Sequence, residues 1–130
     1  MEKFFLFLII TLSMLHSSVA QRQGQDRIDS LLGDVPKSVE DTNKVKLLID
    51  LSHTYYSINP DDGLRYGKEA LALAEKLTWK KGIANAYRTI AGNYGFGKSD
   101  YATALKYSLQ ALEQFQQIGD KTGTARMLSD

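Results

Sequence analysis

One segment of the sequence has the residue types and spacing of a phosphate-binding loop. Gly92, Gly97, Lys98 and Ser99 fit the pattern G-x-x-x-x-G-K-S within the segment GNYGFGKS. In such a loop the backbone amides bind phosphate oxygens, the lysine contacts the outer phosphates and the serine binds magnesium. That geometry also requires a buried β-strand before the loop, whereas the preceding segment IANAYRTIAGNY has helical periodicity. The sequence therefore favours a turn between helices and keeps nucleotide binding as a remote alternative.

No other set of side chains in the sequence suggests a catalytic or metal site. The chain has no cysteine, which excludes disulfides, thiolate zinc sites and thiol nucleophiles. His16 and His53 are the two histidines, and His16 lies in an apolar first segment that we expect to be removed. Asp61 and Asp62 follow a helix start, where the helix dipole favours negative charge. We therefore expect no enzyme activity, no cofactor and no bound metal.

The overall composition is that of a globular protein without a nucleic-acid surface. Of the 130 residues, 43% are hydrophobic and 24% are charged, and both values are near the average for globular domains. The net charge is +1, and no block of like charge occurs, although nucleic-acid binding needs a basic stripe. Only two prolines occur and strand-like alternation is absent. These features favour an all-α chain that does not bind nucleic acid.

Residues 1–20 have the features of a secretory signal peptide. Lys3 supplies a basic start, an apolar run follows through Leu15, and Ser18 and Ala20 are the small residues of a cleavage site. Crossing a bilayer takes about 20 apolar residues, which is more than this run supplies. We expect cleavage before Gln21 and export to the periplasm or the extracellular space. The alternative is an uncleaved membrane anchor.

The remaining chain shows helical periodicity interrupted by turn signals. Residues 21–41 are typical of a linker that is loose up to Gln25 and contains a short helix at 26–32. Apolar residues then recur at spacings of three and four, which indicates helices. We expect these longer helices at about 42–58, 60–77, 83–94, 100–118 and from 121 onward, with the segment from Gly95 to Ser99 as a linker.

Two internal shifts show that the helices repeat. When the sequence is aligned with itself at an offset of 41 positions, Tyr66 aligns with Tyr107. At an offset of 39 positions, Tyr55 aligns with Tyr94. Repeats of this length indicate arrays of helical hairpins. We predict repeat units at about 42–79 and 80–119, and a partial unit at 120–130.

Small residues follow one face of the second repeated helix. They are Gly63, Gly67, Ala70 and Ala74, and the equivalent face of the fourth helix carries Ala104, Ser108 and Ala111. A glycine inside a helix costs about 0.5–1 kcal/mol relative to alanine, and the close approach of a neighbouring helix would explain that cost. We expect Tyr55 and Tyr94 on the preceding helices to be the large partners of these small residues.

At these positions the sequence resembles the longer variant of the tetratricopeptide repeat (TPR) family. The matching residues in the second unit are Tyr87, Ile90, Ala91, Tyr94, Ala104, Tyr107 and Ala111. The resemblance covers about residues 42–130, although the proline that closes the short form of the repeat is lacking. It implies a right-handed superhelical array of antiparallel helix hairpins, which is a TPR-like α-solenoid.

The order of segments also resembles the N-terminal periplasmic region of bacterial sensor kinases and nucleotide cyclases that carry such repeats. Any kinase or cyclase domain would lie downstream of this sequence. The resemblance implies a non-catalytic scaffold that binds a protein or peptide and serves as the sensing or interaction part of a receptor. A structural or oligomerisation module is the alternative.

A TPR-like array binds its partner on the concave face formed by the first helix of each repeat. The expected contact residues are Lys46, Ile49, His53, Tyr56, Asn85, Arg88 and Arg126. Arg88 and Arg126 suit an acidic peptide, but the sequence favours a solvated surface as their explanation. Ile49, His53, Thr89 and Asp130 replace residues of the family's carboxylate clamp for chaperone tails, so that activity is not expected.

The partial third unit leads to an expectation about the end of the array. Solenoids need about three repeats, because each hairpin buries its apolar side against a neighbour. Ala125 and Leu128 would lack a covering helix. We expect an incomplete array that melts at low temperature, frays from Thr122 or self-associates through its open end. Membrane contact is expected only through the signal peptide or a missing downstream segment.

Overall fold

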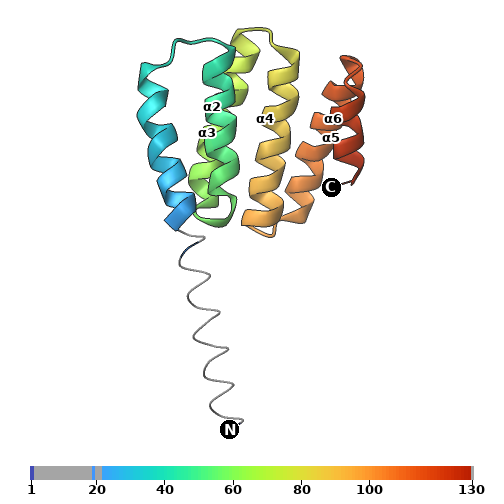
Figure 1. The fold of residues 1–130 in the computed structure, drawn as a ribbon. Helices are drawn as coiled ribbons and strands as arrows, with labels where there is room; N and C mark the ends of the chain where they lie inside the picture. Colours follow the sequence, from blue (N-terminus) through green and yellow to red (C-terminus); the bar gives the residue numbers. More distant parts are fainter. Residues whose placement is uncertain (2–18, 20–21, 130) are drawn as a thin grey trace.

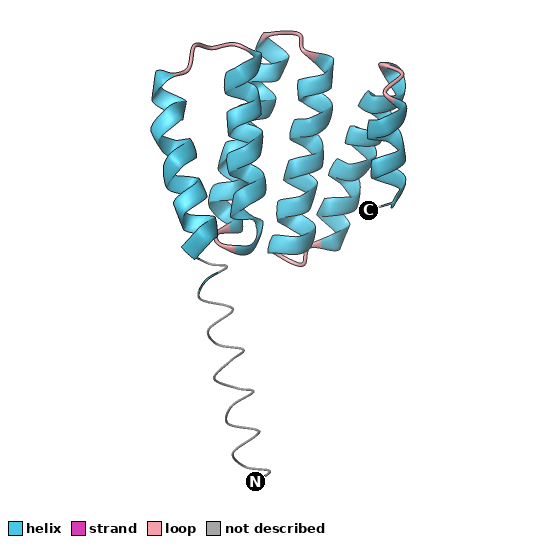
Figure 2. Cartoon of the chain, viewed as in Figure 1, coloured by secondary structure: helices cyan, strands magenta, loops and turns pink. Residues whose placement is uncertain are grey.

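The computed structural model describes Met1, Val19 and residues 22–129, and this part of the chain is all α-helical (Figure 1, Figure 2). An N-terminal helix at residues 22–34 precedes the short turn η1 (Val35–Lys37). The longer helices are α2 (Thr42–Thr54), α3 (Pro60–Lys76), α4 (Lys80–Gly92), α5 (Tyr101–Gln117) and α6 (Lys121–Ser129). The turns η2 (Tyr55–Ser57) and η3 (Asn93–Gly97) extend α2 and α4.

The described residues contain no β-strand, and none of their helices is both long and apolar enough to cross a membrane. The predicted signal peptide lies outside the described residues, apart from Met1 and Val19. Its cleavage before Gln21 therefore stays a prediction.

Polar side chains at the starts of the helices explain where most of them begin. The capping residues are Asp41, Asn59, Asp100 and Asp120. Each side chain accepts a hydrogen bond from a backbone amide of the first turn, which otherwise has no partner within its helix. At the start of α2, for example, Asp41 Oδ1 lies 2.8 Å from the Asn43 amide nitrogen. Pro60 then occupies the first turn of α3, where its missing N–H costs nothing.

Consecutive helices pack against one another, and the molecule extends from the N-terminal helix at one end to α6 at the other (Figure 1). Helix α2 also contacts α4. The main core lies between the N-terminal helix, α2, α3 and α4, and a smaller core lies where α4, α5 and α6 meet. The fully buried residues of the main core include Ile28, Val45, Leu48, Leu51, Ala70 and Ala86.

The repeat seen in the sequence is visible as a recurring pair of stacked tyrosines. The rings of Tyr55 and Tyr66 lie 5.7 Å apart and within 13° of parallel. Those of Tyr94 and Tyr107, at the equivalent positions, lie 5.6 Å apart and within 6° of parallel. The all-helical, repeat-like architecture predicted from the sequence is therefore confirmed.

Three local predictions were wrong. The helix predicted at 26–32 begins at residue 22, so residues 22–25 are helical and not loose, and it continues through Gly33. The predicted linker from Gly95 is in part the π-helical turn η3, which continues α4. Tyr55 and Tyr94 are not the nearest partners of Gly63 and Gly67, because the atoms closest to the missing side chains of these glycines belong to Asn93, Ile90 and Ser52.

Candidate functional site

Three aromatic side chains gather where η2 meets the end of α4. The rings of His53 and Tyr56 lie 4.7 Å apart, and the ring of Phe96 lies 6.4 Å from that of Tyr56. The Tyr56 hydroxyl is 3.0 Å from Thr89 Oγ1 on α4. A Cβ atom at Gly92 would overlap the Tyr56 ring, so glycine lets this ring lie against α4. We call His53, Tyr56 and Phe96 the aromatic cluster.

The environment of His53 favours its neutral form. Partial burial lowers the pKa of the imidazole below its ordinary value of 6.5, and the Arg88 cation lowers it further. Asp50 acts in the opposite direction, while Arg27 adds to the lowering. The Nε atom of Arg88 is buried, and no described residue accepts a hydrogen bond from it. Arg88 therefore has hydrogen-bonding capacity beside the aromatic cluster.

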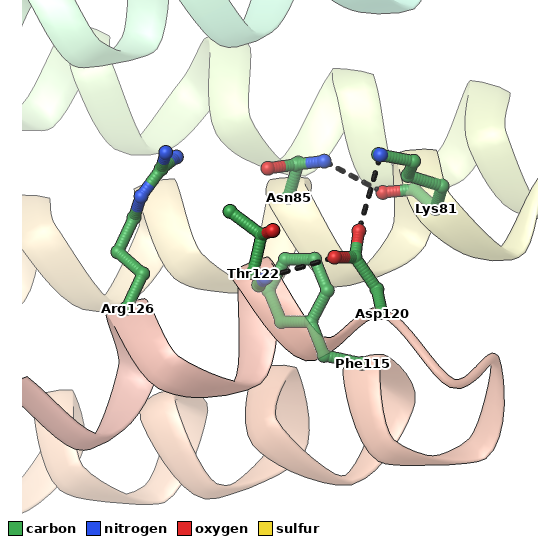
Figure 3. Close-up of a pocket in the computed structure, with 7 residues that line it drawn as sticks. Lys81, Asn85, Phe115, Asp120, Thr122 and Arg126 are labelled. Atoms are coloured by element: carbon green, nitrogen blue, oxygen red, sulfur yellow. Dashed lines mark hydrogen bonds and ion pairs between the residues drawn. The ribbon is translucent and has the colours of Figure 1, made fainter.

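A cavity of about 240 Å³ lies nearer the start of α4, between α4 and α6 (Figure 3). Asn85 lines it from α4, and Arg126 extends from α6 on the same side. Lys81 Nζ lies 3.1 Å from Asp120 Oδ2 at one edge of the cavity. The Asp120 carboxylate also accepts a hydrogen bond from the Gly123 amide, and these contacts lower its pKa. The acid at this site is thus already engaged by partners of the protein itself.

The seven predicted contact residues do not all lie together in the structure. His53, Tyr56 and Arg88 come together at the aromatic cluster, and Asn85 and Arg126 share the cavity. Lys46 instead lies over the ring of Trp79, with its Nζ 5.9 Å from the ring centroid. Ile49 is half-buried and packs against the main core. Asp130, another predicted position of this face, lies outside the described residues.

A buried polar network next to the aromatic cluster was missed in the sequence. Asn93 is fully buried, and its Nδ2 donates to the carbonyl oxygens of Ser52 and Thr89 and to Ser52 Oγ, at 3.0–3.1 Å. Ser52 Oγ in turn donates to the carbonyl oxygen of Gly63 at 2.6 Å. Asn93 belongs to the glycine-rich segment that suggested a phosphate loop or a turn. Both interpretations left its side chain without a structural role.

The glycine-rich segment itself follows a helix and not a strand. Gly92 ends α4, and the amides of Lys98 and Asp100 donate to the carbonyl oxygens of Asn93 and Tyr94. The Lys98 ammonium group contacts the Asp61 carboxylate. A phosphate-binding loop would direct these groups toward a ligand, whereas here they are bonded within the protein.

Among the described residues, no three histidine, aspartate or glutamate side chains come together as a metal site. No protein-family model, no curated protein and no solved structure matches this chain.

Proposed function

We propose that the chain is an exported, non-catalytic scaffold that binds an extended acidic segment of a protein or peptide along one face of α2, α4 and α6. In this proposal the helices form a right-handed, TPR-like array and belong to the sensing or interaction part of a bacterial receptor. The recurrence of the stacked tyrosine pairs supports an array of equivalent hairpins.

The observation that carries the proposal is a set of cations without partner acids along this face. Among the described residues, Arg88 and Arg126 form no ion pair. The nearby acids Asp50 and Asp120 are paired with bases, at 3.9 Å and 3.1 Å respectively. Carboxylates of a bound segment would therefore meet cations that are not neutralised by the protein.

The aromatic cluster gives the same face an apolar contact. Phe96 is largely exposed, and its ring lies beside that of Tyr56. Aromatic side chains on a rigid backbone are typical anchors of binding interfaces, because they offer a large contact area with few rotatable bonds. An extended segment with both acidic and apolar side chains fits this arrangement best.

Fluorescence anisotropy with a labelled peptide of alternating glutamate and apolar residues tests the proposal. We expect Arg88→Gln and Arg126→Gln each to weaken binding about tenfold, which corresponds to about 1.4 kcal/mol. Added salt should weaken binding further, because exposed charges are screened. Lys106→Gln, an exposed change on α5, is the matched control and should have no effect. Equal affinity for a peptide with lysine in place of glutamate would contradict the proposal.

The same measurements separate the alternatives. A structural module would bind neither peptide. A nucleotide-binding protein would show a rise in melting temperature with magnesium and ATP that Lys98→Ala abolishes. We expect no such rise, since the Lys98 side chain already contacts Asp61.

A further inference from the structure

The cavity between α4 and α6 has an excess of one positive charge. Its charged side chains are Lys81, Asp120 and Arg126. Lys81 and Asp120 pair with each other at 3.1 Å, whereas Arg126 forms no ion pair within the described part of the chain. A guanidinium group binds both oxygens of a carboxylate, so a single carboxylate is the anion that matches this excess.

Asn85 adds a hydrogen-bond acceptor to the same cavity. Its Nδ2 donates to the carbonyl oxygen of Lys81 at 2.9 Å, and its Oδ1 is turned toward the Arg126 side of the cavity (Figure 3). An amide oxygen accepts hydrogen bonds from N–H groups. The cavity thus offers a cation to a carboxylate and an acceptor to a backbone N–H, and an acidic residue within a peptide supplies both groups.

Close packing fixes where α6 begins, and with it the backbone that carries Arg126. A Cβ atom at Gly123 would overlap the ring of Phe115, which is buried on α5. The Gly123 amide also donates to Asp120 Oδ1 at 2.9 Å. Arg126 follows Gly123 by about one helical turn, so this first turn holds Arg126 at a defined position beside α4.

The aromatic cluster lies at a second point on the same helix. Gly92, against which the Tyr56 ring lies, is farther along α4 than Asn85 by about 10 Å, since a helix rises about 1.5 Å per residue. The cluster lies on the α2 side of α4 and the cavity on the α6 side, and the axes of neighbouring packed helices are about 9 Å apart. The two offsets together separate the sites by about 13 Å.

An extended peptide spans this separation with a definite number of residues. It advances about 3.3 Å per residue, so about 13 Å corresponds to about four residues. Successive side chains of an extended chain point to opposite sides, and side chains an even number of positions apart share a side. A spacing of about four positions therefore meets both requirements, whereas about three or about five positions would turn one side chain away from the protein.

Two cations of this face can receive the acidic side chain. Arg88 lies beside the aromatic cluster, where the Phe96 ring is 80% exposed. Arg126 instead shares its cavity with the acceptor Asn85. A carboxylate placed against an exposed aromatic ring loses water without gaining a partner from the ring. The cavity is therefore the better site for the acid, and the aromatic cluster is the better site for an apolar side chain.

We propose that the cavity and the aromatic cluster together select for the spacing between two side chains of a bound segment. The cavity holds an acidic side chain through Arg126, and Asn85 accepts a hydrogen bond from a backbone N–H beside it. The aromatic cluster contacts an aromatic or large aliphatic side chain about four positions away. This inference rests on the proposed function and adds to it a sequence pattern that the partner must carry.

Fluorescence anisotropy with labelled peptides of equal composition tests the spacing. Each peptide carries one glutamate and one phenylalanine in a background of serine and threonine, and their separation varies from about two to about six positions in both orders. We expect the tightest binding at about four positions in at least one order, and about tenfold weaker binding at about three and about five positions. A general attraction for acidic and apolar segments would affect all these peptides equally.

Paired substitutions in protein and peptide assign each side chain to its site. Arg126→Gln and a change of the peptide glutamate to glutamine should each weaken binding, and combining them should have little further effect. The same should hold for Phe96→Ala combined with a change of the peptide phenylalanine to alanine. Arg126→Gln combined with the phenylalanine change should instead multiply the two effects, because separate contacts act independently. Lys106→Gln, on the exposed surface of α5, is the matched control and should leave the spacing preference unchanged.

The outcomes distinguish this inference from the proposed function. A preference for about four positions, with the glutamate coupled to Arg126, supports both. Equal affinity at every spacing, or coupling of the glutamate to Arg88 and not to Arg126, overturns the spacing inference and leaves an acid-binding scaffold. Binding of only the peptide with alternating glutamate and apolar residues also overturns it, because two side chains at one spacing would then be insufficient. If that alternating peptide does not bind either, the proposed function itself fails.

Discussion

At the scale of single residues, Asn93 links α2, η3 and α3 through buried polar contacts. Its side chain bonds to Ser52 and Thr89, and its Oδ1 lies against Gly63. We expect Asn93→Ala to lower the free energy of unfolding by about 1–3 kcal/mol, because buried acceptors lose their donor. Urea denaturation followed by circular dichroism measures this change. Asn85→Ala removes only an exposed contact to Lys81 and serves as the control, and an equal loss in both variants would argue against the network.

His53 gives the molecule a pH dependence of predictable sign. Burial and Arg88 lower its pKa below 6.5 in the folded state, so the unfolded state binds the proton more readily. The contribution of the neutral His53 ring to the free energy of unfolding is fully present above pH 6.5, and it is lost as the pH falls through the folded-state pKa. The pKa values of four acids, Glu40, Asp41, Asp100 and Asp120, are also lowered in the folded state. Their contribution to the pH dependence of stability therefore occurs at lower pH than that of His53.

We therefore expect the urea concentration at the unfolding midpoint of the wild type to decrease as the pH is lowered from about 7.5 to about 5.5. His53→Gln should show a smaller change over the same interval, because glutamine does not titrate. A wild-type midpoint that stays constant or rises on acidification would contradict the desolvation of His53.

At the scale of helices, the sequence located the repeated elements well because each carries its own local signals. Pro60 after Asn59 and the acidic cap Asp100 mark helix starts that the structure reproduces. The N-terminal helix was underestimated, since its polar first residues, 22–25, show no apolar periodicity, and the helix ends one residue after Gly33. The turn η3 was missed because its conformation depends on the burial of Asn93, which is a tertiary effect. The predicted contact residues of the face stay a prediction, and two of them, Lys46 and Ile49, contact Trp79 and the main core, respectively.

The small residues of α3 and α5 set how closely these helices approach their neighbours. Gly63 lies under Asn93, and Ala111 is fully buried. We expect Gly63→Leu and Ala111→Leu each to destabilise the fold by about 1–3 kcal/mol or more, because the added side chain has no space. Thermal melting by circular dichroism measures the effect.

Two positions provide matched controls for these leucine substitutions. Gly33 has open space around its missing side chain, and Ala102 is exposed on α5. Gly33→Leu and Ala102→Leu should change the melting temperature little. If all four leucine variants melt like the wild type, close helix packing at Gly63 and Ala111 is wrong.

At the scale of the whole molecule, the two ends differ in how much of their apolar surface is buried. The N-terminal helix covers Val45 and Leu48 with Ile28, and all three are fully inaccessible to solvent. At the other end, Gly123 is the only buried residue of α6, and α5 leaves Leu105 exposed. The stability of the array should therefore be concentrated toward its first half, where helices have neighbours on both sides.

The last prediction asks whether the N-terminal helix belongs to the same cooperative unit as the repeats. Ile28→Ala should lower the free energy of unfolding by about 2–5 kcal/mol, because a large buried side chain is removed. The only tryptophan, Trp79, lies between α3 and α4 and reports on the middle of the molecule. If the helices unfold together, Ile28→Ala shifts the Trp79 fluorescence transition and the circular dichroism transition equally. Leu128→Ala, at an exposed position of α6, should shift neither. A loss of helix signal in Ile28→Ala that precedes any change at Trp79 would show instead that the N-terminal helix unfolds independently of the array.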